Sequence, residues 1–190
     1  MSNGHDNHRW MQGAAAALML VSGAWAFEAP PGDTCAQADA ITGVGVFPFD
    51  STGATSDGPT HDACALGGGA DIAADVWFCW TSPGDGAVTL DTCSGTTVDT
   101  KIAVYDGCAC PPGDANLLTC GDDACVYQTR VTFDAVAGGQ YLVRLGAHPG
   151  LGGGEGVFTI TLGDVAEPAC TAVGAACQPR TLWNAYNSAR

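Results

Sequence analysis

Residues 128–146 read QTRVTFDAVAGGQYLVRLG, and this stretch decides the fold class. Its first eight residues alternate, with Val131 and Phe133 on one parity and polar residues on the other. Such alternation is typical of a strand that buries one face. A glycine pair at 138–139 then gives a turn signal before a second apolar run. We therefore predict two short strands joined by a turn.

The same pattern recurs along the chain between clusters of turn-forming residues. The chain has 27 glycines and 10 prolines, which favour turns. Its acidic residues are mostly aspartates, which break helices and cap turns. We expect about eight strands, over residues 43–50, 75–81, 87–93, 100–106, 116–119, 128–135, 140–146 and 156–163. Strands at hairpin spacing without helices predict an all-β protein, an antiparallel β-sandwich or jelly roll.

The first 26 residues have the features of an export signal. Arg9 precedes the short apolar run at 14–21, and Ala24-Trp25-Ala26 matches a cleavage site. The run is shorter than the roughly 20 residues of a membrane span, so we expect no stable membrane insertion. An uncleaved or buried helix is the alternative. We thus expect a signal peptide at 1–26, a sandwich module at 27–163 and a tail at 164–190, in a secreted or surface-exposed protein.

The charge of the chain excludes one class of partner. The formal net charge is -14, and Lys101 is the only lysine. Phosphate binding depends on Lys and Arg, so we expect no nucleic-acid partner. The same argument disfavours anionic membrane surfaces.

All ten cysteines follow residue 26, and their even number favours a disulfide framework in an exported protein. Proximity along the chain suggests the pairs Cys35–Cys64, Cys79–Cys93, Cys108–Cys125, Cys110–Cys120 and Cys170–Cys177. Cys108 and Cys110 are too close in sequence to bond to each other without strain. Zinc binding by the four cysteines between residues 108 and 125 is the alternative. We expect the framework to staple the sandwich.

Several motifs in fixed order give the chain a family resemblance. The motifs are Asp33-Thr-Cys-Ala-Gln-Ala, Gly53-Ala-Thr-Ser-Asp-Gly-Pro, Asp75-Val-Trp-Phe, Leu90-Asp-Thr-Cys, Asp99-Thr-Lys-Ile-Ala-Val-Tyr-Asp-Gly-Cys and Cys120-Gly-Asp-Asp-Ala-Cys. From Asp33 to Leu162 the chain resembles the bacterial pre-peptidase C-terminal domain superfamily, which is similar to clostridial collagen-binding domains. The resemblance implies a jelly-roll module of the kind attached to secreted proteases and surface proteins. Some such modules bind calcium or a polymeric substrate.

Calcium is the first candidate ligand, because it prefers carboxylate and carbonyl oxygens on loops. Asp99, Asp106, Asp122 and Asp123 flank two neighbouring strands, and we expect them to converge at one end of the sandwich, with Asp75 as a further ligand. The spacing is not that of an EF-hand loop. Turn and capping roles for these aspartates are the alternative.

Carbohydrate binding and hydrolysis are the second and third hypotheses. Trp77 and Trp80 differ in parity, so they face opposite sides of a strand and at least one lies in the core. Tyr105, Tyr127 and Tyr141 remain as candidates for an exposed aromatic row. The chain has no G-x-S-x-G and no H-E-x-x-H motif, so we expect no enzyme. An aspartate pair acting as in a glycosidase is the alternative.

Assembly is the remaining hypothesis. A β-sandwich has open edges that accept a strand from a neighbour. Residues 27–34 or the tail at 178–190 could reach another subunit, with Phe27, Trp183 and Tyr186 as apolar anchors. Since no enzyme accompanies the module, we expect a structural or adhesive protein, such as a fibre subunit, that self-associates or binds an extracellular polymer. The alternative is a polysaccharide- or protein-binding accessory module for a secreted hydrolase.

Overall fold

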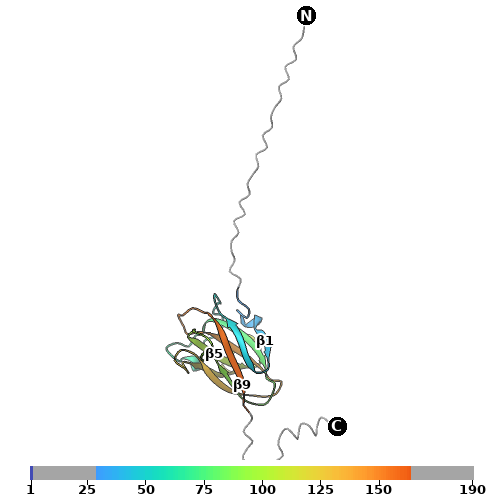
Figure 1. Ribbon diagram of the computed structural model, residues 1–190, viewed down its shortest axis with the longest axis vertical. Helices are drawn as coiled ribbons and strands as arrows, with labels where there is room; N and C mark the ends of the chain where they lie inside the picture. Colours follow the sequence, from blue (N-terminus) through green and yellow to red (C-terminus); the bar gives the residue numbers. More distant parts are fainter. Residues whose placement is uncertain (2–28, 164–190) are drawn as a thin grey trace, which may run out of the picture.

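The computed structural model describes residue 1 and residues 29–163. Residues 29–163 form a β-sandwich (Figure 1). Two short 3-10 helices, η1 (Cys35–Gln37) and η2 (Asp62–Cys64), lie in the connections. The strands are β1 (Asp39–Thr42), β2 (Gly45–Asp50), β3 (Ala73–Thr81), β4 (Gly86–Asp91), β5 (Thr100–Asp106), β6 (Leu117–Asp122), β7 (Arg130–Ala135), β8 (Gln140–Ala147) and β9 (Glu155–Leu162). Sheet A has the order β1-β3-β8-β5-β6, and sheet B has the order β2-β9-β4-β7. The predicted all-β sandwich is therefore confirmed.

The main core lies between the two sheets, and the residues predicted to alternate inward build it. Val131 and Phe133 of β7 are buried there, as are Val88 and Leu90 of β4. Sheet A contributes Val76, Phe78, Trp80, Ile102, Val104, Tyr141, Val143 and Leu145 to the same cluster. Strand parity thus places apolar side chains correctly because successive residues point to opposite faces.

Sheet A is covered on its other face as well. The long connection at 51–72 contacts that face, where a second buried cluster contains Ile72, Trp77, Ala103, Tyr105 and Leu142. Strand β5 is consequently buried on both sides, except at Asp106. Sheet A is therefore the middle layer between sheet B and the 51–72 connection, which we call the outer layer.

The order of the strands differs from the hairpin arrangement predicted from their spacing. Only β5 and β6 are both consecutive and paired; β3 to β4, β6 to β7 and β7 to β8 all cross between the sheets. The glycine pair at 138–139 thus joins two sheets instead of turning a hairpin. Strand β1 was not predicted, since it holds a single large apolar residue, Ile41, and it pairs with β3 in parallel. The other pairings are antiparallel.

Four disulfides connect the eight described cysteines, and none of the four pairs expected among these cysteines from chain proximity forms. The bonds are Cys35–Cys110, Cys64–Cys120, Cys79–Cys108 and Cys93–Cys125. Cys79 and Cys93 do not pair because β3 and β4 belong to different sheets. Cys79 has the same parity as Trp77, so it lies on the face of sheet A that points away from β4. Cys108 and Cys110 bond to different partners, as expected. No free thiol remains among the described residues, so the zinc alternative has no ligands there.

Some predictions concern residues that the structure does not describe. The signal peptide, Phe27, the tail with Trp183 and Tyr186, and the pair Cys170–Cys177 all lie outside the described residues. Within residues 29–163, no helix has the length and apolar character needed to span a bilayer.

Candidate functional site

A buried arginine fixes the outer layer to sheet A. Arg144 of β8 donates from Nε to Asp75 Oδ2 at 2.5 Å, and both side chains are almost fully buried. Its other nitrogens donate to the carbonyls of Pro59 at 2.7 Å and Ile72 at 2.9 Å. Burial raises the pKa of the Asp75 carboxyl, and the Arg144 guanidinium opposes that rise. Asp75 is therefore the ion-pair partner of Arg144, and it does not lie in the group of clustered carboxylates described below.

Other aspartates hold the outer layer by accepting hydrogen bonds from the backbone and from Trp77. Asp33 Oδ1 accepts from Thr55 N–H at 2.5 Å, and Asp57 Oδ1 accepts from Trp77 Nε1 at 2.9 Å. The guanidinium of Arg144 also lies 5.4 Å from the centre of a Trp77 ring. These carboxylates act as structural groups, which is the turn-and-cap role that their short side chains favour.

A buried histidine bridge was missed by the sequence analysis. His61 contacts Asp114 through Nδ1 and lies 3.0 Å from the Tyr105 hydroxyl through Nε2. His61 is 2% exposed and Tyr105 is 0% exposed, so neither side chain faces a substrate. The bridge joins segments that are 53 residues apart, and no local motif marks such a contact. We interpret it as a structural connection between the outer layer and the 107–116 loop.

The aromatic residues do not form an exposed row among the described residues. Trp77 and Trp80 point to opposite faces of β3, as predicted, and both are fully buried. Tyr105 and Tyr141 are buried too, and only Tyr127 is exposed, at 59%. Among the tryptophans and tyrosines of this part of the chain, the predicted aromatic platform for a sugar is therefore reduced to one residue.

Three of the four aspartates predicted to bind calcium come together. Oxygen atoms of Asp99, Asp122 and Asp123 lie within 4.8 Å of one another. The β5–β6 register explains this, because Lys101 pairs with Asp122 and Asp99 stands two residues before Lys101 on the same face. Asp123, at φ 51°, turns the chain beside Asp122. We call Asp99, Asp122 and Asp123 the acidic cluster.

Asp106 does not join the acidic cluster. Asp99 precedes β5 and Asp106 ends it, so a seven-residue strand separates the two carboxylates. Such a strand is roughly 23 Å long. The predicted convergence was wrong for this residue because it overlooked the length of the strand between the two aspartates.

The electrostatics of the acidic cluster are unbalanced. Burial raises the pKa of Asp99, and the carboxylates of Asp123 and Asp122 raise it further. Lys101 Nζ lies 3.6 Å from Asp122 Oδ2, and both of these side chains are nearly fully buried. Lys101 donates its hydrogen bonds elsewhere, to the carbonyls of Leu66 at 3.1 Å and of Gly69. One lysine therefore stands beside three carboxylates, and His148 and Lys101 only partly oppose the rise in the pKa of Asp99.

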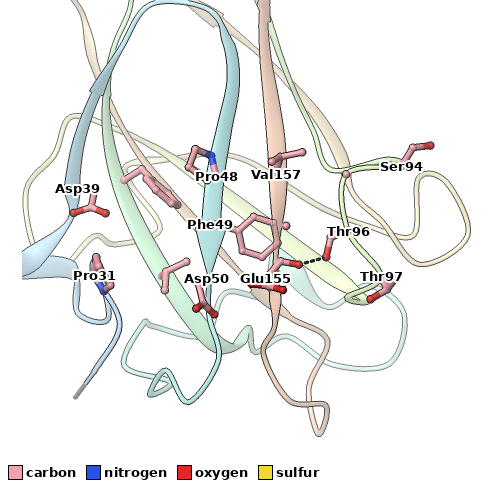
Figure 2. A pocket seen from close by; sticks show the side chains of 14 residues that line it. Pro31, Asp39, Pro48, Phe49, Asp50, Ser94, Thr96, Thr97, Glu155 and Val157 are labelled. Carbon is pink, nitrogen blue, oxygen red and sulfur yellow. Dashed lines mark hydrogen bonds between the residues drawn. The ribbon is translucent and has the colours of Figure 1, made fainter. Parts of the chain in front are cut away.

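A groove of about 860 Å³ opens beside the edge strands β1 and β2 (Figure 2). Phe49, Val76 and Phe78 of the core line it, together with Pro31, Pro48 and Val157. Its polar lining is hydroxyl-rich and acidic, with Ser94, Thr96, Thr97, Asp39, Asp50 and Glu155. The groove thus combines apolar and acidic surface.

Local hydrogen bonds shape the groove. Thr96 Oγ1 donates to the Glu155 carbonyl at 2.8 Å, which fixes the 94–97 loop against β9 (Figure 2). Hydrogen bonds from the side chain and the backbone N–H of Thr52 lower the pKa of Asp50. The groove was not predicted, since its residues come from six separate segments and no sequence motif connects them.

Comparison with known proteins adds no assignment. Neither a protein-family model nor a curated protein matches this chain.

Proposed function

We propose that the protein is a non-catalytic structural or adhesive protein of the cell surface or extracellular matrix, which self-associates through its terminal segments. The observation that carries the proposal is the groove at the open edge of the sandwich. The groove lies beside the edge strands β1 and β2 and has an apolar lining that includes Phe49, Val76 and Phe78. An extended terminal segment of a neighbouring molecule, such as residues 27–30, would find apolar contacts and unpaired strand edges there.

The properties of the sandwich support such a role. Four disulfides stabilise the sandwich, and Cys64–Cys120 and the Arg144 hydrogen bonds to the carbonyls of Pro59 and Ile72 tie the outer layer to sheet A. A framework of this kind is typical of proteins that work in an oxidising extracellular environment. The proposal includes two further points: residues 1–26 direct export of the chain, and residues 33–162 form a module of the pre-peptidase C-terminal kind.

The test is the oligomeric state of the purified protein at about 10–100 µM, a range in which weak extracellular associations with micromolar Kd are populated. We expect oligomers or fibres by light scattering and negative-stain microscopy. Removing residues 27–30 or 178–190 should reduce them. The N-terminal deletion stops before Asp33, because Asp33 accepts a hydrogen bond from Thr55 and supports the fold.

A point variant tests the groove itself. Thr97 is exposed at the groove, so Thr97→Trp should fill it and reduce assembly without changing the core. Thr132→Trp, at an exposed position on β7 outside the groove, is the matched control. A wild-type chain that stays monomeric at these concentrations contradicts the assembly proposal.

The groove also favours a second function, that of an accessory module that binds a polysaccharide or protein for a hydrolase. Its hydroxyl and carboxylate groups supply hydrogen bonds, and its apolar floor supplies contact area. In that case the protein stays monomeric, sediments with insoluble polysaccharide or collagen, and loses that binding in Thr97→Trp. A monomer that binds no polymer contradicts both functions.

A further inference from the structure

The acidic cluster contains buried carboxylate oxygens that have no hydrogen-bond donor. Within the described residues, Asp99 Oδ1 and both carboxylate oxygens of Asp122 are buried without a hydrogen-bond partner. The Asp122 side chain is only 1% exposed, so water does not solvate it as it would solvate a surface aspartate. A buried carboxylate without donors costs several kcal/mol unless a counter-charge compensates it.

Lys101 compensates only part of that charge. Its ammonium group lies 3.6 Å from Asp122 Oδ2, beyond hydrogen-bonding distance. The ammonium donates instead to the carbonyls of Leu66 and Gly69, which orient it toward the outer layer. With Asp99, Asp122 and Asp123 ionised, the cluster and Lys101 together carry two uncompensated negative charges. That charge matches a divalent cation.

The backbone of the outer layer approaches the same carboxylates. A Cβ placed on Gly67 would lie 2.5 Å from Asp122 Oδ2 and 3.4 Å from an Asp123 oxygen. Gly67 has φ +63°, which a residue with a side chain rarely adopts. A glycine at this position keeps the space in front of the carboxylates free of side-chain atoms.

We propose that Asp99, Asp122 and Asp123 form a calcium site at the junction of β5, β6 and the outer layer. The three carboxylates offer only oxygen ligands, which calcium and magnesium prefer over transition metals. Calcium accepts an irregular set of six to eight oxygens, whereas magnesium requires a near-ideal octahedron. The irregular set here, drawn from a strand end, a turn and the residue before a strand, suits calcium.

The test measures calcium binding to the full chain after removal of metal with a chelator. Titration calorimetry should give a Kd of about 0.1–1 mM, the range of extracellular calcium modules. About 10 mM calcium should raise the Tm by about 3–10 °C, since a ligand that binds only the folded state stabilises it by mass action. Magnesium should bind at least tenfold more weakly.

Variants locate the site. Asp122→Asn and Asp99→Asn should lose the calcium-induced rise in Tm. Asp106→Asn, at the far end of β5, should keep it and is the matched control. Asp123 is exposed, so Asp123→Asn folds even if a buried substitution does not, and it should weaken binding at least tenfold.

The outcomes separate a calcium site from an acidic cluster with a purely structural role. No binding heat and no change in Tm at 10 mM calcium would overturn the proposal. So would a calcium response that survives Asp122→Asn and Asp123→Asn, or magnesium binding as tight as calcium binding. A structural pairing of Asp122 with Lys101 alone predicts that Asp122→Asn lowers Tm equally with and without calcium, and this result also overturns the proposal.

Discussion

At the scale of single residues, the buried Tyr105 is expected to lower the stability of the folded protein at alkaline pH. Its hydroxyl lies 3.0 Å from His61 Nε2, and its side chain is completely buried. Burial raises the pKa of Tyr105 above its ordinary value, since the ionised form would lose its hydration. A group whose pKa is raised by folding contributes stability below its unfolded pKa, near 10, and loses it as pH rises through the folded pKa.

We therefore predict two effects of Tyr105→Phe. At pH 7 the variant should be less stable by about 1–3 kcal/mol, because His61 Nε2 loses its partner. Between pH 10 and 12 the stability of the wild type should fall more steeply than that of the variant, by up to about 1.4 kcal/mol per pH unit. Guanidinium unfolding at pH 7, 10 and 11 measures both effects.

Tyr127→Phe is the control for this experiment. Tyr127 is 59% exposed, so removing its hydroxyl should change neither the stability at pH 7 nor the slope above pH 10. Parallel pH profiles for the wild type and Tyr105→Phe would show that ionisation of Tyr105 does not limit alkaline stability.

At the scale of elements, β2 is an edge strand whose unpaired side is interrupted by Pro48. Ser51 N–H donates to the Gly154 carbonyl at 2.9 Å. In the β2–β9 register, residues 45, 47 and 49 have the same parity as Ser51, so their backbone groups also form hydrogen bonds with β9. Residues 46, 48 and 50 therefore direct their backbone groups away from β9. Proline has no N–H, so Pro48 costs no hydrogen bond within the sheet and removes one donor from the edge.

Pro48→Thr should make the edge more adhesive. The added N–H gives an incoming strand one more hydrogen bond, worth about 1.4 kcal/mol, or roughly tenfold in association. Sedimentation velocity over a concentration series measures the effect. Val46→Thr, on the same edge, changes a side chain and adds no backbone N–H, so it should associate as the wild type does. Equal association of Pro48→Thr and the wild type would show that this edge does not pair with other chains.

The elements also show what the sequence can and cannot predict. The alternation of Val131 and Phe133 predicts which face of β7 is buried, because parity is a local property. It does not predict that β7 and β8 belong to different sheets, because partner choice depends on the whole topology. The acidic cluster was partly predictable, since Asp99 and Asp122 flank strands that are neighbours in sequence. The bridge from His61 to Asp114 was not, since nothing local connects those residues.

At the scale of the molecule, the four disulfides lie outside the core between the sheets. Three of them lie on the outer face of sheet A, and Cys93–Cys125 lies at one end of the sandwich. Cys64–Cys120 joins the outer layer to β6, and the bonds of Cys35 and Cys79 to the loop after β5 fasten the N-terminal segment and β3. None of the eight bonded cysteines belongs to the core between the sheets. Cys64–Cys120 thus holds the outer layer to sheet A, and Cys93–Cys125 joins the segments that follow β4 and β6, while the apolar core holds the two sheets together.

Two of these bridges allow a test of how they stabilise the whole chain. Cys35–Cys110 and Cys79–Cys108 end on the same loop but span 75 and 29 residues. If the bridges act by restricting the unfolded chain, removing the longer one should cost about 4.5 kcal/mol and removing the shorter one about 3.6 kcal/mol. Double serine variants, compared by guanidinium unfolding, measure both values. Peptide mapping under non-reducing conditions should first recover the 35–110 and 79–108 links. A 35–64 link would contradict the fold, whereas an inverted order of stabilities would show that native contacts, and not loop length, determine what each bridge contributes.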